Sequence, residues 1–190
     1  ANVACGLAKL GAKVAFVGRL GEDQQGRDFR SLMGAKGINL LGLQIDELRS
    51  TRVVLVRRDT KGERAFQGFH GDSGEGFADQ ALDLNALKKI WSSLANEATC
   101  LLIGTIPLAT KASSEVLMWS VNEASKQSIK IALDVNWRPT FWDISAAPDS
   151  GPNKSTLEII LELLEKAAFL KLSREEAMWF FNTPYPEKIS

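Results

Sequence analysis

The stretch Lys130-Ile-Ala-Leu-Asp-Val-Asn-Trp-Arg-Pro-Thr-Phe-Trp142 combines a strand signal with a group of polar residues. It opens with a short apolar run, which predicts a strand that is buried on both faces. Asp134, Asn136 and Arg138 follow in alternate positions, and the next residue is a proline, which ends regular strand pairing. Because ligands in open α/β sheets collect beyond the carboxyl ends of strands, these three polar residues are candidates for a binding site.

The three side chains suit a ligand that carries both hydroxyl groups and an anion. A carboxylate and an amide form hydrogen bonds with sugar hydroxyls. A guanidinium group matches the geometry of phosphate. A simpler interpretation is a loop in which Asp134 and Arg138 only form an ion pair with each other. The stretch by itself leaves both interpretations open.

Composition excludes several classes of protein. The chain has 190 residues and is 45% apolar, which fits one globular domain with or without a small appendage. Lys+Arg and Asp+Glu both total 23, so no net charge favours nucleic acid or an anionic membrane as a partner. No apolar run approaches the roughly 20 residues that span a bilayer. Two cysteines and one histidine argue against a disulfide framework and a zinc site, and favour a reducing compartment.

The second half of the chain alternates helices and strands. The expected strands are 100–104, the run that begins at Lys130, and 169–172; the expected helices are 84–95, 111–126, 156–168 and the segment after Ser173. This order predicts a parallel sheet with right-handed crossovers. Thr105 and Pro107 follow the first of these strands and are expected to line the same crevice as the polar residues of the central stretch. A Glu at 176 makes a capping box with Ser173.

The first part of the chain predicts a different pattern. A helical stripe ends at Gly11, a strand is expected at 13–17, a turn in the glycine-rich run 18–26, and a helix capped by Asp23 that runs to about Ala35.

A β-rich block then interrupts the pattern. Strands are expected at 40–45, 52–58 and 64–69, with a hairpin turn at 59–63. One apolar face is expected to carry Val53, Leu55, Ala65, Phe66 and Phe69. An inserted sheet with such a face serves as a lid over a cleft or as a dimer surface. His70 follows, and a single loop histidine is more often incidental than catalytic.

Four segments of the chain carry motifs in a fixed order. They are Ala1-Asn2-Val3-Ala4, the run Gly21-Glu22-Asp23-Gln24-Gln25-Gly26, the Asp-x-Asn-x-Arg element at 134–138, and 171–176, a strand leading into a Ser-x-x-Glu motif. Taken together they resemble the ribokinase-like, or pfkB, carbohydrate kinases, and the fructokinases most closely. The first segment is similar to the end of that family's Gly-Gly-x-x-x-Asn signature, and the second continues the pattern. The resemblance covers the whole chain. It implies a three-layer α/β/α fold with a mostly parallel sheet and a small β-sheet lid at about 40–69.

The resemblance also implies roles for individual residues. The family phosphorylates a sugar hydroxyl with ATP and Mg²⁺. Asn2 would hydrogen-bond the sugar, and Asp134 and Asn136 would shape the floor of the substrate crevice. Arg138 would be catalytic, because it would face the transferring phosphoryl group. Glu176 would help to order Mg²⁺ through water, and no residue is expected to bind the metal directly. As alternatives, Asn2 would be a helix cap and Glu176 only the partner in a capping box.

Parts of the family pattern do not occur in this chain. The catalytic base of the family is an Asp in a Gly-Ala-Gly-Asp motif, which the chain lacks. The adenine-binding segments are expected beyond Ser190, and the first sugar-binding strand before Ala1. Residues 1–190 are therefore expected to be a partial pfkB domain that is inactive alone. The family's lid often also pairs two subunits, which predicts a homodimer through the lid.

The resemblance favours an enzyme that phosphorylates fructose. One alternative is a non-catalytic fructokinase-like scaffold of the plastid transcription machinery, although we would expect such a protein to lack the central arginine, and Arg138 is present. A second alternative is a nucleoside kinase of the same fold. Val135, Trp137 and the pair Phe141-Trp142 are more similar to cyanobacterial-type than to cytosolic plant members. The expected location is therefore the cytoplasm or the plastid stroma, although no targeting segment is visible.

Overall fold

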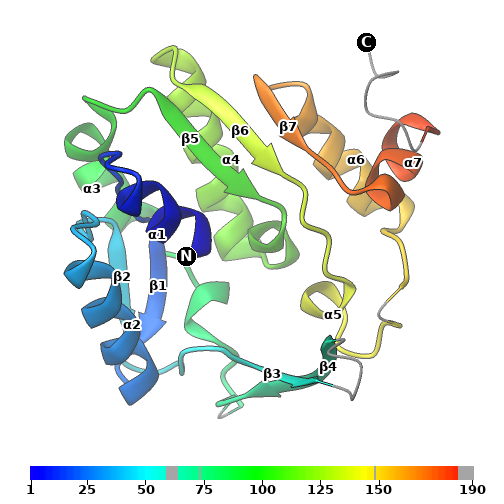
Figure 1. The fold of residues 1–190 in the computed structure, drawn as a ribbon, viewed down its shortest axis with the longest axis horizontal. Helices are drawn as coiled ribbons and strands as arrows, with labels where there is room; N and C mark the ends of the chain where they lie inside the picture. Colours follow the sequence, from blue (N-terminus) through cyan, green and yellow to red (C-terminus); the bar gives the residue numbers. More distant parts are fainter. Residues whose placement is uncertain (59–63, 73, 148, 184–190) are drawn as a thin grey trace. The chain divides into compact units, whose positions relative to one another are not determined.

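The computed structural model describes residues 1–58, 64–72, 74–147 and 149–183. The chain divides into two compact units, Ala1–Asn96 and Glu97–Ser190, and each is described by itself (Figure 1). The hairpin turn expected at 59–63 lies outside the described residues.

The first unit contains a two-stranded parallel sheet, helices and a separate β-hairpin. Its elements are α1 (Asn2–Lys9), β1 (Gly18–Gly21), α2 (Gln24–Ala35), β2 (Leu43–Asp46), β3 (Val53–Arg58), β4 (Arg64–His70), η1 (Ala78–Gln80) and α3 (Leu84–Ala95). Strands β1 and β2 pair in parallel, from Gly18 opposite Leu43 to Gly21 opposite Asp46. Met33 of α2 and Leu87 of α3 are fully buried.

The prediction of a strand at 13–17 is wrong. That segment makes one isolated bridge, between Ala15 and Asn39, and the strand itself is β1, inside the glycine-rich run that was expected to turn. Local apolar content cannot fix such bounds, because a parallel strand extends only where its partner runs beside it. Here the partner β2 begins at Leu43, later than the expected start at residue 40.

Helix ends in this unit follow the sequence signals. Gly11 has φ +87° after α1, a left-handed conformation that glycine adopts without steric cost. Asp23 caps α2, since its Oδ1 accepts a hydrogen bond from the amide of Gly26 at 2.7 Å. Both predicted helices are confirmed.

The β3–β4 hairpin is antiparallel and contains a bulge. Leu55 lies opposite Gly68, but the next residue, Val56, lies opposite Phe66, so Gln67 is an extra residue in β4. Gly68 has φ +125° at this position.

The bulge changes which side chains share a face of the hairpin. Phe69 lies opposite Val54 and Phe66 lies opposite Val56, and directly opposed residues point to the same face. The two phenylalanine rings are in edge contact, 5.0 Å between centroids. The expected face that joined them to Val53 and Leu55 is therefore wrong, because regular alternation along β3 puts those two residues on the other face.

The second unit is an alternating α/β structure. Its elements are β5 (Cys100–Gly104), η2 (Ile106–Ala109), α4 (Lys111–Lys126), β6 (Lys130–Asp134), α5 (Pro139–Trp142), α6 (Lys154–Leu164), β7 (Phe169–Lys171) and α7 (Arg174–Phe181). The strands form one parallel sheet in the order β5-β6-β7. The parallel sheet that the sequence predicted is confirmed, although α6 ends earlier than expected.

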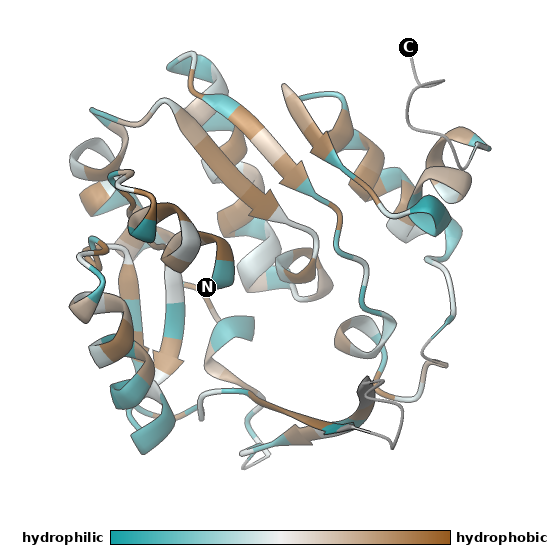
Figure 2. Cartoon of the chain, in the orientation of Figure 1, coloured by the Kyte–Doolittle hydropathy of each residue, from teal (hydrophilic) through white to brown (hydrophobic). Residues whose placement is uncertain are grey.

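The core of this unit lies on one face of the sheet. Ile131 and Leu133 of β6 are buried, as are Val121 of α4 and Ile160 of α6. Figure 2 shows the apolar character of these strands. The sequence predicts that β6 is buried on both faces, but only one face is buried. On the other face Lys130 is exposed, and Ala132 and Asp134 are partly exposed.

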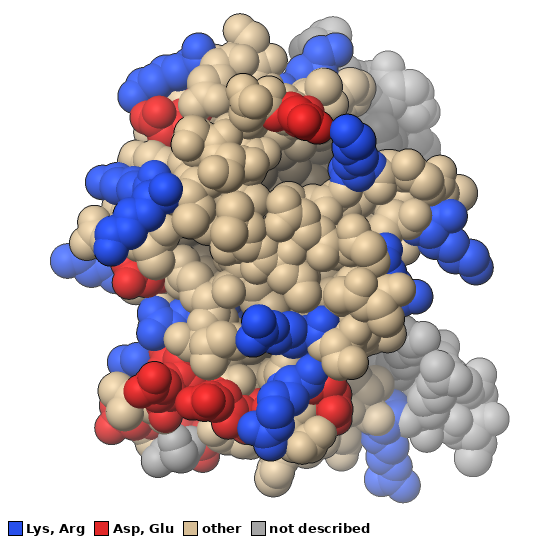
Figure 3. Space-filling view, turned by 90° about the vertical axis from the view of Figure 1, so that its left-hand side faces the viewer, with Lys and Arg blue, Asp and Glu red and all other residues tan. Residues whose placement is uncertain are grey.

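Charged side chains of both signs occur on the face drawn in Figure 3. This is in keeping with the equal totals of 23 for Lys+Arg and for Asp+Glu. Among the described residues, none of the helices combines the length and apolar character that a bilayer crossing requires.

Candidate functional site

The carboxyl ends of the three parallel strands meet at one edge of the sheet. Gly104, Asp134 and Lys171 are in register across β5, β6 and β7. The polar stretch 134–138 therefore leaves the central strand between two neighbouring strand ends. This is the position at which open parallel sheets bind ligands, as the sequence predicted.

Asp134 pairs with Lys171, a residue for which the sequence predicted no role. Lys171 Nζ lies 2.9 and 2.8 Å from the two carboxylate oxygens of Asp134. In the described structure Asp134 thus pairs with Lys171, and not with Arg138 as in the simpler interpretation. The signal that could have found Lys171 is the register of adjacent parallel strands, which is a long-range property.

Asn136 adopts a left-handed backbone conformation, with φ +45°. Such a conformation is uncommon outside glycine, although asparagine tolerates it better than most residues. The residue before it is fixed on both of its backbone groups. The Val135 amide donates to Lys171 O at 3.2 Å, and the hydroxyl of Thr105 donates to Val135 O at 2.6 Å. Thr105 is fully buried, so it supports the loop and does not line a crevice.

The residue after Asn136 is fixed by Glu176. The amide of Trp137 donates to Glu176 Oε1 at 2.7 Å, and the amide of Ser173 donates to Glu176 Oε2 at 2.7 Å. Ser173 Oγ in turn accepts from the Glu176 amide at 3.1 Å, which completes the predicted capping box of α7. Glu176 is 5% exposed. Its carboxylate therefore links the loop to α7, in addition to capping that helix.

In addition to these hydrogen bonds, aromatic packing around Trp137 fixes the same loop. The ring of Trp137 lies 5.4 Å from that of Trp142 and 6.4 Å from that of Trp179, between centroids. Trp137 Nε1 donates to Ser150 O at 2.7 Å. The indole of Trp137 is buried, so the loop cannot swing without breaking this cluster.

Arg138 is the exposed member of the loop. Its Nη1 donates to Trp137 O at 2.7 Å, which holds the guanidinium close to its own backbone. The residue is otherwise open to solvent. A guanidinium in this position can bind an anionic oxygen, because it is a cation with several N–H donors.

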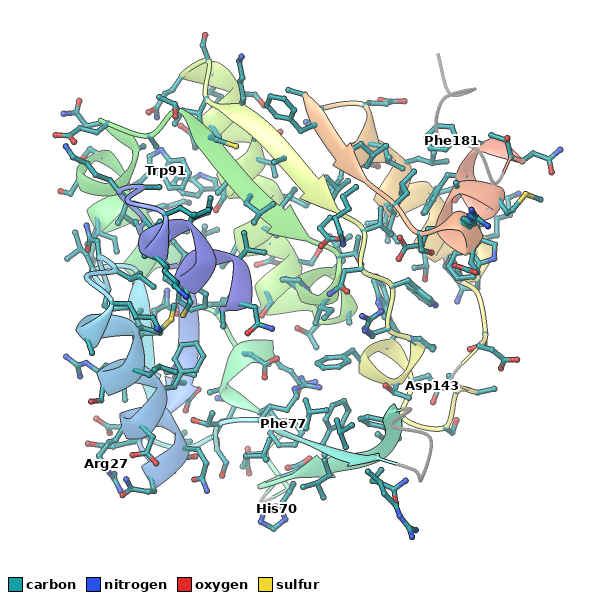
Figure 4. All side chains as sticks on the ribbon, viewed as in Figure 1. Arg27, His70, Phe77, Trp91, Asp143 and Phe181 are labelled. Carbon is teal, nitrogen blue, oxygen red and sulfur yellow. The ribbon has the colours of Figure 1, made fainter. Side chains whose placement is uncertain are left out.

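Asn2 is the first residue of α1, in the other unit, and is exposed. The N-cap of this helix is Ala1, so the alternative that Asn2 is the cap is wrong. Its predicted contact with sugar stays a prediction. His70 ends β4 and is exposed, with its ring directed out from the hairpin (Figure 4).

Asp23 joins the glycine-rich run of the first unit to a later segment by hydrogen bonds. Asp23 Oδ2 accepts from the amide of Thr51 at 2.6 Å, while Oδ1 accepts from Gly26. Burial alone would raise the pKa of Asp23, but these amide hydrogen bonds outweigh it and lower the pKa below 3.8. The charged carboxylate thus ties the start of α2 to the segment that leads into the hairpin.

The acidic side chains near the loop are already engaged in hydrogen bonds or an ion pair. Within the described part of the chain there is no group of three or more His, Cys, Asp or Glu side chains placed to hold a metal ion. Both oxygens of Glu176 accept amide hydrogen bonds, and those of Asp134 face Lys171. The predicted role of Glu176 in ordering Mg²⁺ through water remains untested.

Comparison with known proteins identifies the family. The model of the pfkB family of carbohydrate kinases matches residues 1–189. The chain belongs to this family. Fructokinase-2 of Oryza sativa subsp. japonica is 29% identical over 176 residues, which are 93% of this chain and 48% of that protein. Probable fructokinase-6, chloroplastic, of Arabidopsis thaliana is 26% identical over 192 residues, 100% of this chain and 46% of that protein.

Comparison with a solved structure confirms the fold. The crystal structure of an uncharacterized sugar kinase from Pyrococcus horikoshii in complex with ATP has a TM-score of 0.79 and 25% identity, and the match covers 95% of this chain and 54% of that one. The predicted ribokinase-like α/β fold is therefore confirmed. The chain spans about half the length of the curated relatives it matches.

Proposed function

We propose that this chain is part of an ATP-dependent kinase that phosphorylates a hydroxyl group of fructose. The observation that carries the proposal is the exposed guanidinium of Arg138, on a loop fixed at the carboxyl ends of three parallel strands. Phosphoryl transfer depends mainly on positioning and on stabilising the charge of the transferring group. A fixed cation beside Asp134 and Asn136, which can bind hydroxyls, meets both demands.

The choice of fructose is supported by the relatives. The rice and Arabidopsis proteins that match the chain are named as fructokinases. In the proposed complex, Asp134 and Asn136 hydrogen-bond the sugar, and sugar binding by Asn2 is proposed from the family signature alone. The carboxylate of Asp134 reaches the sugar while Lys171 balances its charge.

ATP as the phosphoryl donor is supported by the Pyrococcus horikoshii sugar kinase, which was solved in complex with ATP. Mg²⁺ would arrive with the ATP phosphates and would neutralise part of their charge, since this ion keeps several of its waters and uses few protein ligands. The described carboxylates suit such an arrangement better than direct coordination, because they are already hydrogen-bonded.

We also propose that residues 1–190 are only part of the kinase domain and are inactive alone. The matched relatives are about twice as long, which supports a catalytic base and adenine-binding segments outside this chain. The β3–β4 hairpin would be the lid. Val54 and Val56, which share a face of the hairpin, are 44% and 51% exposed, and this apolar surface would cover the sugar or pair with a second subunit.

The location proposed for the protein is the cytoplasm or the plastid stroma. The plastid is supported by one relative that is named as chloroplastic.

The test is a coupled assay of ADP release from the complete protein, with ATP, Mg²⁺ and, in turn, fructose, ribose or adenosine. Residues 1–190 alone are assayed beside it. We expect turnover with fructose from the complete protein only. Turnover with adenosine instead would favour a nucleoside kinase. No turnover with any acceptor, from a folded complete protein, would refute the kinase proposal and favour a scaffold.

A further inference from the structure

We propose that Glu176 is a positioning residue that sets the conformation of the loop 135–138, and through it the placement of Arg138. The inference rests on the proposed kinase function for its kinetic consequence. The structural part of the inference, that Glu176 holds the loop, does not depend on that function.

The contacts of Glu176 are those of a clamp between two distant segments. Its Oε1 accepts from the Trp137 amide and its Oε2 from the Ser173 amide, both at 2.7 Å. Hydrogen bonds from amides to a buried carboxylate are short and strong. Ser173 is fixed at the start of α7, so the carboxylate transmits the position of that helix to Trp137, 39 residues earlier in the chain.

The loop requires such support because Asn136 has φ +45°. A non-glycine residue keeps a left-handed conformation only where its surroundings determine it. Thr105 fixes the carbonyl on the amino-terminal side of Asn136, and Glu176 fixes the amide on the carboxyl-terminal side. Loss of the Glu176 contact would free the peptide group between Asn136 and Trp137 to rotate toward a more common conformation.

Rotation of that peptide would displace Arg138. The guanidinium is held by its hydrogen bond to Trp137 O, so its position follows the backbone at Trp137. A displacement of about 1 Å in a group that must meet a transferring phosphoryl can cost about 100-fold in rate. Glu176 would therefore affect kcat without touching either substrate.

This role differs from ordering Mg²⁺, and the two make different predictions. A residue that orders the ion changes the Mg²⁺ concentration needed for half-maximal rate. A residue that positions the loop changes kcat at saturating Mg²⁺ and leaves that concentration unchanged. The 5% exposure of Glu176 and its two amide hydrogen bonds favour positioning.

The experiment compares Glu176→Ala and Glu176→Gln with the matched control Asn153→Ala in the complete protein. Glutamine keeps one acceptor oxygen, so it can serve only one of the two amides. Asn153 caps α6 by accepting from the Thr156 amide at 2.9 Å, and its loss weakens a helix start in the same unit. Hydrogen exchange by mass spectrometry follows the peptide that contains Trp137, and ADP release gives kcat and the Mg²⁺ dependence.

We expect Glu176→Ala to speed exchange at the Trp137 amide by about 10-fold or more and to lower kcat by about 10- to 100-fold, with the half-saturating Mg²⁺ concentration unchanged within about 2-fold. Glu176→Gln should show smaller changes in the same direction, and it remains informative if the alanine variant does not fold. Asn153→Ala should lower stability and leave exchange at Trp137 and kcat as they are.

Unchanged exchange at Trp137 in both Glu176 variants would overturn the inference. So would a loss of kcat that excess Mg²⁺ restores. The exchange measurement requires no turnover. A wild-type protein without kinase activity would therefore refute the proposed function, while exchange alone would decide whether Glu176 holds the loop.

Discussion

Gly26 packs directly against the carbonyl oxygen of Gly21, and a Cβ atom at Gly26 would overlap that oxygen. Gly21 is equally confined, since a Cβ there would lie 2.6 Å from Arg49 O. The two glycines therefore let the end of β1, the start of α2 and the segment after β2 pack at backbone contact. This close approach explains why glycine occupies positions 21 and 26.

The effect of replacing a glycine in α2 by alanine should depend on how closely other atoms pack against that glycine. Gly26→Ala should lower the free energy of unfolding by about 1–3 kcal/mol, because the backbone of Gly21 must move. Gly34→Ala is the control in the same helix. Its nearest neighbour would be Leu40 Cδ1 at 3.9 Å, so alanine should be neutral or stabilise by up to about 1 kcal/mol. Urea unfolding measures both, and equal stabilities for the two variants would contradict the packing argument.

Asp46 should make the protein sensitive to acid. Burial alone would raise the pKa of Asp46, but the amides of Arg49 and Leu48, together with the guanidinium of Arg19 at 3.0 Å, lower it below 3.8. A carboxyl with a lowered pKa in the folded state contributes its stability above pH of about 4 and loses it as pH falls through the lowered pKa. The free energy of unfolding should therefore decrease as pH drops below 4.

The variant Asp46→Asn tests this assignment. The neutral amide cannot be protonated in this range, so the loss of stability between pH 5 and pH 3 should be smaller than in the wild type. Urea unfolding at several pH values gives the slope. A variant with the wild-type slope would show that other carboxyl groups cause the acid sensitivity.

The sequence predicted those strands and helix ends that depend on residues close together in the chain. The apolar run before Asp134 marked the central strand, and the pair Ser173 and Glu176 marked a helix start. Other features depend on how strands that are distant in the sequence pair with one another. The contact of Lys171 with Asp134 depends on which strands are neighbours, and the bulge at Gln67 depends on hairpin pairing, so neither is visible in a single stretch of sequence.

Arg138→Ala should lower kcat by about 100- to 1,000-fold in the complete protein, because it removes a cation from the transferring phosphoryl group. The KM for sugar should change little, since the ground-state sugar would not contact the guanidinium. Arg138→Lys should recover part of the rate, as it restores the charge without the planar fork. Arg30→Ala, at an exposed position on α2, is the control. An unchanged kcat in Arg138→Ala, measured by ADP release, would remove this residue from the mechanism.

The ion pair of Asp134 and Lys171 should contribute little to stability despite its short distances. The side chain of Lys171 is 74% exposed and that of Asp134 is 27% exposed, so solvent screens their attraction. A double-mutant cycle with Lys171→Met and Asp134→Asn, followed by urea unfolding, should give a coupling free energy below about 1 kcal/mol. The coupling should weaken further in about 1 M NaCl, where the screening length falls to about 3 Å. A larger coupling that salt does not reduce would mean that the pair is shielded from solvent, and Lys171 would then be a structural support of the site and not an exposed partner of Asp134.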